Sequence, residues 1–229
     1  MLICHRHRFI FLKTQKTAGT AIEIALRAVM GREDVITPIS REDERLSRQL
    51  GRPGPRHFRA PLREYSGRDL ARLLTRARLK KRFYNHIPAA EVKALLPAAV
   101  WDGYLKISVE RNPFDKAISS YYWRTRKLAR PPAIADYLRH CPVSELSNWA
   151  IYTLNDNVIT DVMLRHESLA SDLQQLSRRL ALEHPLRLPE QRPKGQHRRD
   201  PRPWQEVLDA ASQERIRQVC AREIEALHA

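Results

Sequence analysis

The strongest constraint on the fold is a repeated order of buried strand, short turn and amphipathic helix. Apolar runs mark strands at 7–13, 104–110 and 158–164, and apolar residues at helical spacing follow each of them. Strands that alternate with helices are typical of α/β domains, in which helices pack against a parallel sheet. With 229 residues, the chain predicts a single α/β domain over 1–229, with a central parallel β-sheet flanked by helices.

Helices are predicted between and after these strands. Thr20 and Glu23 have the spacing of a capping box, which predicts that the first helix begins at Thr20. Further helices are expected at 89–96, 114–128, 143–154, 168–182 and 205–227, the last as one piece or two. The segment 32–82 breaks the pattern, because its part 41–82 holds fourteen Arg or Lys residues against five acids. We expect a basic insertion there, part loop and part helix around 70–79.

The net charge of +15 favours an anionic partner such as phosphate, sulfate, nucleic acid or an acidic polymer. No apolar run reaches the roughly 18 residues of a membrane span, and Phe9–Leu12 is too short for the core of a signal peptide. Cys4, Cys141 and Cys220 are far apart and odd in number, which argues against a disulfide framework, and no paired-cysteine motif suggests zinc. A cytoplasmic protein without a bound metal is therefore expected, with attachment to a membrane surface left open.

The loop at 13–20, with the sequence KTQKTAGT, joins the first strand to the first helix. Free backbone N–H groups and the positive end of the helix dipole make such a junction suitable for an anion. Lys16 adds a positive charge, and Gly19 lets the backbone approach a ligand closely. The lysine precedes the glycine and a second glycine is lacking, so the loop is not a Walker A motif and an ATP or GTP hydrolase is disfavoured. An ordinary turn with a solvated lysine is the alternative.

A second group of residues, RNPFDKAISSYYW, follows the second strand. Arg111 lies at the carboxyl end of that strand, where α/β sheets bind ligands. Pro113 suits the first turn of the next helix, and Ser119 lies about two turns along it. An arginine before the helix and a serine on it can contact one phosphate from two sides. The alternative is a structural cap on an amphipathic helix whose core residues are Ile118, Tyr122 and Trp123.

These two segments, KTAGTAIE and RNPFDKAISSYYW, resemble the signature segments of sulfotransferases, which use 3′-phosphoadenosine 5′-phosphosulfate (PAPS) as donor. The similarity is greater to the carbohydrate branch, which includes heparan sulfate 2-O-sulfotransferases and bacterial relatives. It covers most of the chain outside about 32–80 and extends weakly through LRHESLASDLQQL. The resemblance implies a P-loop-like three-layer fold, PAPS as donor, 3′-phosphoadenosine 5′-phosphate (PAP) as product, and no metal.

The resemblance also implies a site for the 5′-phosphosulfate. Lys16 matches the lysine that contacts the transferring group and the bridging oxygen. The positions that cradle the 5′-phosphate, largely through the backbone, match Thr17, Gly19, Thr20 and Ala21. The chain departs from the family pattern at Gln15, where proline is common, and at Ala21, where serine is common. The backbone donors of the loop do not depend on either side chain.

For the 3′-phosphate, the resemblance implies Arg111 and Ser119 as ligands. The segment 194–199 resembles a late basic loop that closes over the nucleotide, with Lys194 and Arg198 as the expected contacts.

The acceptor hydroxyl needs a base to remove its proton. His86 is the best candidate, because it lies just before the helix at 89–96 and because the resemblance implies a catalytic histidine at a similar place. Lys16 and His86 are thus the expected catalytic residues. The alternative is that His86 caps the helix after Pro88, in which case His166 or Glu23 could act as base.

The acceptor is expected to be a carbohydrate or a glycolipid with a free hydroxyl, since the branch acts on saccharides and the segment 41–82 is basic. The alternatives are a protein tyrosine or a small alcohol as acceptor, with 41–82 as an ordinary solvated basic surface. No nucleic acid is expected as partner. Two other classes of function stay open: a non-catalytic basic module that binds nucleic acid or another polyanion, and a nucleotide kinase-like P-loop protein. A polyanion-binding module would not need Lys16, Arg111 and Ser119 together. A nucleotide kinase would need the first glycine and the Gly-Lys pair of a Walker A motif, which this chain lacks.

Overall fold

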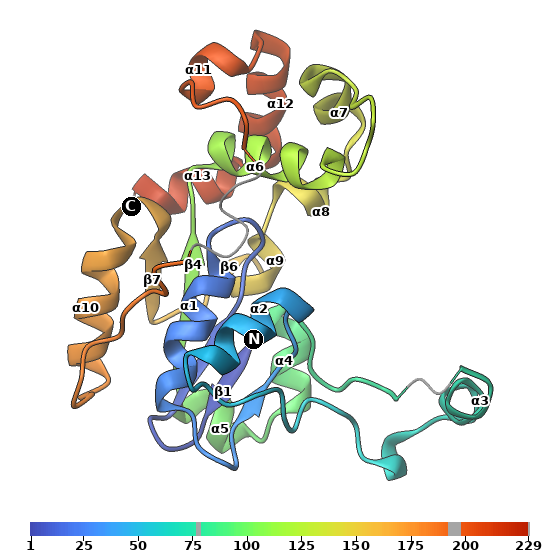
Figure 1. The fold of residues 1–229 in the computed structure, drawn as a ribbon, viewed down its shortest axis with the longest axis vertical. Coiled ribbons are helices and arrows are strands. Elements are labelled where there is room, and N and C mark those ends of the chain that lie inside the picture. The colour runs from blue at the N-terminus through green and yellow to red at the C-terminus, as the bar shows by residue number, and fades with distance from the viewer. Residues whose placement is uncertain (77–78, 192–197, 229) are drawn as a thin grey trace.

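The computed structural model describes residues 1–76, 79–191 and 198–228. It is an α/β protein with a five-stranded mixed sheet, in the order β3-β1-β2-β4-β7, flanked by helices (Figure 1). The strands of this sheet are β1 (Leu2–Cys4), β2 (Phe9–Leu12), β3 (Val35–Ile36), β4 (Leu105–Glu110) and β7 (Val162–Arg165). A separate two-stranded ladder is formed by β5 (Thr153–Leu154) and β6 (Asn157–Val158).

The prediction of a parallel sheet is correct for three strands and wrong for two. β2, β4 and β7 are parallel, with Leu12 opposite Ser108 and Glu110 opposite Arg165. β1 is antiparallel to both β2 and β3, so the sheet is mixed. A three-residue apolar run such as that of β1 is too short to show strand periodicity, and for that reason this edge was not predicted.

Helices cover both faces of the sheet because successive strand residues point to opposite sides. On one face, α1 (Gly19–Leu26) and α10 (Leu169–Arg179) contribute to a core with Phe9 and Phe11. On the other face, the core around Ile10 and Leu12 includes residues of α4 (Ala89–Leu95), α5 (Ala98–Gly103) and α9 (Trp149–Tyr152). All four residues of β2 are buried, which explains its continuous apolar sequence.

A helical lobe lies beyond the carboxyl ends of the parallel strands (Figure 1). It contains α6 (Pro113–Thr125), α7 (Ile134–His140), α8 (Val143–Leu146), α11 (Trp204–Val207) and α12 (Ala210–Val219). Residues of all five helices, among them Phe114, Leu146 and Ile216, share a third apolar cluster. α13 (Ala221–His228) follows α12 and runs back toward the sheet.

Three predicted elements differ in extent from the structure. The helix expected at 205–227 is α11, α12 and α13, separated by Leu208, Asp209 and Cys220. The helix expected at 143–154 is α8 and α9, separated by Ser147 and Asn148 and followed by β5. The strand expected at 158–164 is β7 alone, while Val158 belongs to the hairpin β5–β6. Asn155 and Asp156 both have positive φ in that hairpin, as a two-residue turn of type I′ requires. The hairpin takes up Val158, so the strand of the main sheet begins only at Val162.

The predicted basic insertion at 32–82 contains parts that differ in packing. β3 belongs to the main sheet, and α2 (Arg41–Gln49) buries Asp43 and Ser47 against the body. Residues 59–76 and 79–81, here called the arm, project from the body (Figure 1). The arm includes the short 3-10 helix η2 (Leu62–Glu64) and α3 (Gly67–Arg76). Two further 3-10 helices lie elsewhere, η1 (Arg27–Val29) and η3 (His166–Ser168).

No helix in the described ranges is both long enough and apolar enough to cross a membrane.

Candidate functional site

The loop at 13–18 is held over the carboxyl ends of β2 and β4. The hydroxyl of Ser108 donates to the carbonyl of Leu12 at 2.8 Å, and the hydroxyl of Thr14 donates to the carbonyl of Val109. The hydroxyls of Thr14 and Thr17 are 2.7 Å apart. Two parallel strands thus fix the start of the loop, and Thr14 joins Thr17 to it, at the edge where α/β proteins bind ligands.

The backbone of this loop leaves several donors unused. Lys16 and Ala18 both have a φ of 61°, and Ala18 is the N-cap of α1 without a side-chain bond. Within the described residues, no hydrogen bond uses the backbone N–H groups of residues 17–20. Such N–H groups, at the positive end of a helix and beside residues of left-handed conformation, form a concave site for an anion.

Gly19 is required by close packing at this junction. A Cβ on Gly19 would lie 3.0 Å from Cγ of Lys13 and 3.3 Å from the carbonyl oxygen of Thr14. Any larger residue would push the helix away from the loop and move the free N–H groups.

The predicted capping box at Thr20 and Glu23 is wrong. The helix begins at Gly19, and Glu23 is fully buried, with its carboxylate 2.8 Å from both Lys13 Nζ and an Arg27 nitrogen. Burial alone would raise the pKa of Glu23, but Lys13, the α-amine of Met1 and Arg27 outweigh it and lower the pKa to about 2. An ion cluster of this kind holds a carboxylate charged, so Glu23 is a poor general base.

Beneath the loop lies a buried polar network that the sequence analysis did not find. Asn148 accepts a hydrogen bond from the backbone N–H of Gln15 at 2.9 Å and donates to Gln15 O and to Glu110. Lys116 Nζ lies 3.1 Å from Glu110 and 3.2 Å from Glu223. The network joins the loop to β4, α6 and α13, and so sets the position of Lys16.

Lys16 itself reaches toward the helical lobe. Its Nζ lies 4.8 Å from the centre of the Trp123 ring, on α6, and the guanidinium of Arg126 lies 3.6 Å from the same ring. Trp123 is only half-buried, so it is not a core residue of α6 as the structural alternative assumed. Ser119 lies one helical turn before Trp123 and so shares the side of α6 that Trp123 occupies.

Arg111 lies where β4 ends and is half-buried. Its Nε is buried and has no hydrogen-bond partner within the described residues. Burial lowers the pKa of Arg111, while the carboxylates of Asp115 and Glu167 oppose that shift and Arg198 adds to it. Asp115, Glu167 and Arg198 are thus the charges that act on Arg111.

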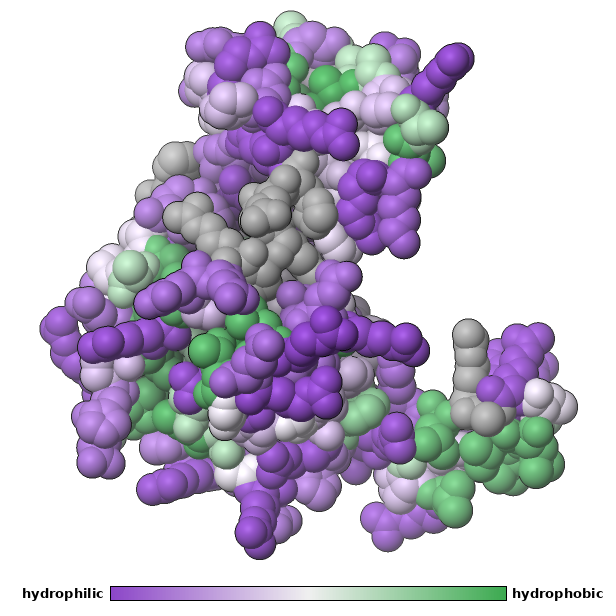
Figure 2. All heavy atoms as spheres, in the orientation of Figure 1, coloured by the Kyte–Doolittle hydropathy of each residue, from purple (hydrophilic) through white to green (hydrophobic). Residues whose placement is uncertain are grey.

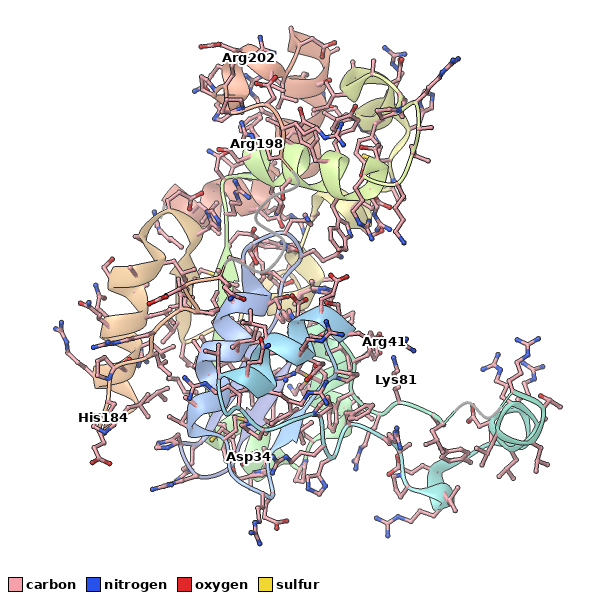
Figure 3. The ribbon with its side chains drawn as sticks, viewed as in Figure 1. Asp34, Arg41, Lys81, His184, Arg198 and Arg202 are labelled. Carbon is pink, nitrogen blue, oxygen red and sulfur yellow. The ribbon has the colours of Figure 1, made fainter. Side chains whose placement is uncertain are left out.

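Arg198 comes to the same place from a distant part of the chain. It pairs with Asp115 on α6 at 2.6 Å, and Figure 3 shows it beside that helix. The hydroxyl of Ser119 is half-exposed and has no hydrogen bond to any described residue. Lys194, the other predicted contact of the late loop, lies outside the described residues.

His86 lies on the other side of the loop. Its Nδ1 is 2.9 Å from the carbonyl oxygen of Lys13, which can only accept, so Nδ1 carries the proton and Nε2 keeps its lone pair. Burial, aided by the charge of Lys13, lowers the pKa of His86 to about 4. The alternative that His86 caps the next helix is wrong, because Pro88 is the N-cap of α4 and no side chain bonds there.

The predicted residues thus gather at the carboxyl edge of β2 and β4 in two groups. Thr17, Gly19 and Thr20 are buried in the loop and the first turn of α1, beside the half-exposed Lys16 and Ala21. Arg111 precedes α6, Ser119 lies on it, and Arg198 pairs with its first turn at Asp115. Two surface hollows, of about 310 and 410 Å³, are lined by residues elsewhere in the fold.

Comparison with known protein families, with curated proteins and with solved structures finds no match for this chain.

Proposed function

We propose that the protein transfers a sulfuryl group from PAPS to a hydroxyl of an acceptor, and that its fold is the P-loop-like three-layer fold of sulfotransferases. The observation that carries the proposal is the set of unused N–H groups at residues 17–20, beside Lys16. Arg111 lies at the end of the neighbouring strand β4, just before α6. Two separate cationic groups at one sheet edge suit a nucleotide with phosphates at both its 5′ and 3′ positions.

In this reaction the acceptor oxygen attacks sulfur in line, and the bond from sulfur to the 5′-phosphate oxygen breaks. Negative charge grows on that oxygen, which leaves as part of PAP. The N–H groups of residues 17–20 bind the 5′-phosphate, and Lys16 stabilises the growing charge. Catalysis then depends mainly on positioning and electrostatic stabilisation, as in phosphoryl transfer.

The acceptor proton passes to Nε2 of His86. The hydrogen bond from Nδ1 to Lys13 O supports this role, because it fixes the tautomer in which Nε2 is the base. The low pKa of His86 keeps the ring neutral at physiological pH, which is the form that accepts a proton, although it also makes the ring a weaker base than an ordinary histidine.

The 3′-phosphate is assigned to Arg111 and Ser119, with Arg198 and Lys194 closing over the nucleotide. The buried, unpartnered Nε of Arg111 and the unbonded hydroxyl of Ser119 support this assignment. The ion pair of Arg198 with Asp115 competes with it, so nucleotide binding has to replace part of that pair.

We propose a saccharide or a glycolipid as the acceptor, for an enzyme that works in the cytoplasm. Figure 2 shows an open hollow between the helical lobe and the arm, with hydrophilic side chains along it. Arg41 at the start of α2 and Lys81 at the root of the arm are labelled on the same side of the molecule in Figure 3. A polar, cationic surface of this kind suits an acceptor with many hydroxyls and negative charge.

The assignment is tested by comparing PAP with 5′-AMP, which lacks the 3′-phosphate. Isothermal titration should show that PAP binds about 30- to 150-fold more tightly, because one charged hydrogen-bonded contact contributes on the order of 2–3 kcal/mol. Arg111→Ala should remove this preference and leave 5′-AMP binding unchanged. Arg139→Ala, an exposed arginine of α7, is the control and should keep the preference. Equal affinity of the wild type for the two nucleotides would reject the proposed site.

A second candidate function is a non-catalytic module that binds polyanions, which the net charge of +15 favours. Binding of a heparin oligosaccharide without any binding of PAP, and without transfer of labelled sulfate from PAPS, would establish that function instead.

A further inference from the structure

The arm exposes a concentration of large apolar side chains. The two leucines with the greatest exposure are both on it, Leu74 at 86% and Leu62 at 65%. Leu70 and Leu79 are also exposed. In Figure 2 the arm carries a hydrophobic face on one side and hydrophilic side chains on the other. Exposed apolar surface gathered on one projection is a usual sign of an interaction site.

This exposure belongs to a built structure. At the neck of the arm, Arg59 and Lys81 form an antiparallel bridge, and the backbone N–H of Ala60 donates to Lys80 O at 3.0 Å. Beyond the neck, Lys80 Nζ reaches Asp69 of α3 at 3.0 Å, and the backbone N–H of Lys80 donates to the hydroxyl of Tyr65 at 2.9 Å. Contacts within the arm therefore define its shape while the leucines stay outside.

The helix of the arm has two chemically distinct faces. Leu70, Leu73 and Leu74 follow the spacing i, i+3, i+4, which places them on one side of α3. Three arginines at a spacing of four residues lie on the other side: Arg68, Arg72 and Arg76. They are exposed, as is Arg63 in η2, and none of the four pairs with a carboxylate within the described residues.

We propose that the arm is a membrane-docking element, which inserts its leucine face into the interface of a bilayer that contains anionic lipids. Charge complementarity selects this occupant, because unpaired arginines beside an apolar face attract anionic headgroups while the leucines enter the boundary of the acyl chains. A second copy of the chain is less suitable. It would bring two such sets of arginines together on molecules that each carry a net charge of +15.

The proposal does not depend on the transfer reaction, since it concerns a surface outside the loop and α6. It is tested by sedimentation of the full chain with vesicles of phosphatidylcholine alone and with phosphatidylserine added. Binding is expected only to the anionic vesicles and should weaken as salt rises. The double variant Leu70→Ser with Leu74→Ser should bind them about tenfold or more weakly, because less apolar surface is buried.

Matched variants separate this role from general effects. Leu128→Ser with Val143→Ser removes two exposed apolar side chains from the helical lobe and should leave vesicle binding unchanged. Circular dichroism and the melting temperature check that both double variants fold. Loss of binding in the lobe variant as well, or wild-type binding that does not need anionic lipid, would overturn the proposal.

Two other outcomes would assign the arm to a different partner and also overturn the proposal. In the first, Arg68→Gln with Arg72→Gln weakens binding to both vesicles and heparin, while the leucine variant binds vesicles normally; the arm is then a polyanion site without insertion. In the second, sedimentation velocity shows a wild-type dimer that the leucine variant loses, and vesicles are not bound; the apolar face then contacts a second copy.

Discussion

At the scale of single residues, His86 shows how local contacts prepare a side chain for chemistry. It has a φ of 62° and gives its Nδ1 proton to a carbonyl of the loop. The sequence predicted the residue but not its protonation state, because its pKa is lowered first by burial and then by the charge of Lys13, 73 positions away. An unperturbed histidine would lose half its activity as a base near pH 6.5.

The first prediction at this scale is a pH profile. Because the pKa of His86 is lowered to about 4, the base stays neutral above that value, and the rate of sulfuryl transfer should remain nearly constant as pH falls through 6.5. It should decline only toward pH 4, where the ring becomes protonated. His86→Ala should lower turnover by roughly 10²–10⁴-fold and leave PAP affinity near that of the wild type.

His184→Ala is the control for this experiment, since that histidine is 87% exposed and distant in sequence from the loop. A wild-type profile with its midpoint near pH 6.5 would contradict the buried environment of His86. Unchanged turnover of His86→Ala would direct the search for the base to His166, because the ion pairs of Glu23 make it unsuitable.

At the scale of elements, the unit of strand, loop and helix was predictable and the contacts between distant elements were not. The apolar run of β2, the lysine before Gly19 and Arg111 after β4 are all local patterns. The interaction of Lys116 with Glu223 spans 107 positions, and no periodicity reports it. Trp123 has the spacing of a core residue on an amphipathic helix, and only the position of the loop reveals its contact with Lys16.

The prediction for the elements concerns α6, which Lys116 joins to β4 and α13. Its ammonium is 1% exposed and lies between two carboxylates that are equally buried. Lys116→Met would leave Glu110 and Glu223 with no opposing charge between them, and removing one partner of a buried ion pair typically costs about 3–5 kcal/mol. Urea unfolding should show a loss of this size in the free energy of unfolding.

Lys127→Met is the matched control, because Lys127 follows α6 and is exposed. It should change the free energy of unfolding by about 0.5 kcal/mol or less. If the two variants were equally stable, the buried ammonium would contribute little to the docking of α6 on the sheet.

For the molecule as a whole, the cluster around Glu23 joins the first strand, the loop, α1 and α2. The carboxylate contacts the α-amine of Met1, Lys13 and Arg27, and Arg27 in turn pairs with Glu44 of α2 at 2.9 Å. One buried carboxylate therefore influences the site and the sheet edge together. The charge of Glu23 therefore affects the free energy of unfolding of the whole molecule and not the stability of one element alone.

The last prediction follows from the sign of that ionisation. The pKa of Glu23 is lowered from 4.5 to about 2, so its contribution to stability is complete above pH 4.5 and is lost as pH falls from 4.5 to 2. The shift corresponds to about 3 kcal/mol in the free energy of unfolding. Other carboxylates titrate in the same range, and the informative quantity is therefore the difference between wild type and Glu23→Gln. Urea unfolding should show the variant to be less stable at neutral pH and to lose less stability on acidification. Glu183→Gln, at a residue that is 90% exposed, should follow the wild type throughout. Parallel pH curves for the wild type and Glu23→Gln would mean that Glu23 keeps an ordinary pKa and that the cluster does not hold these four segments together.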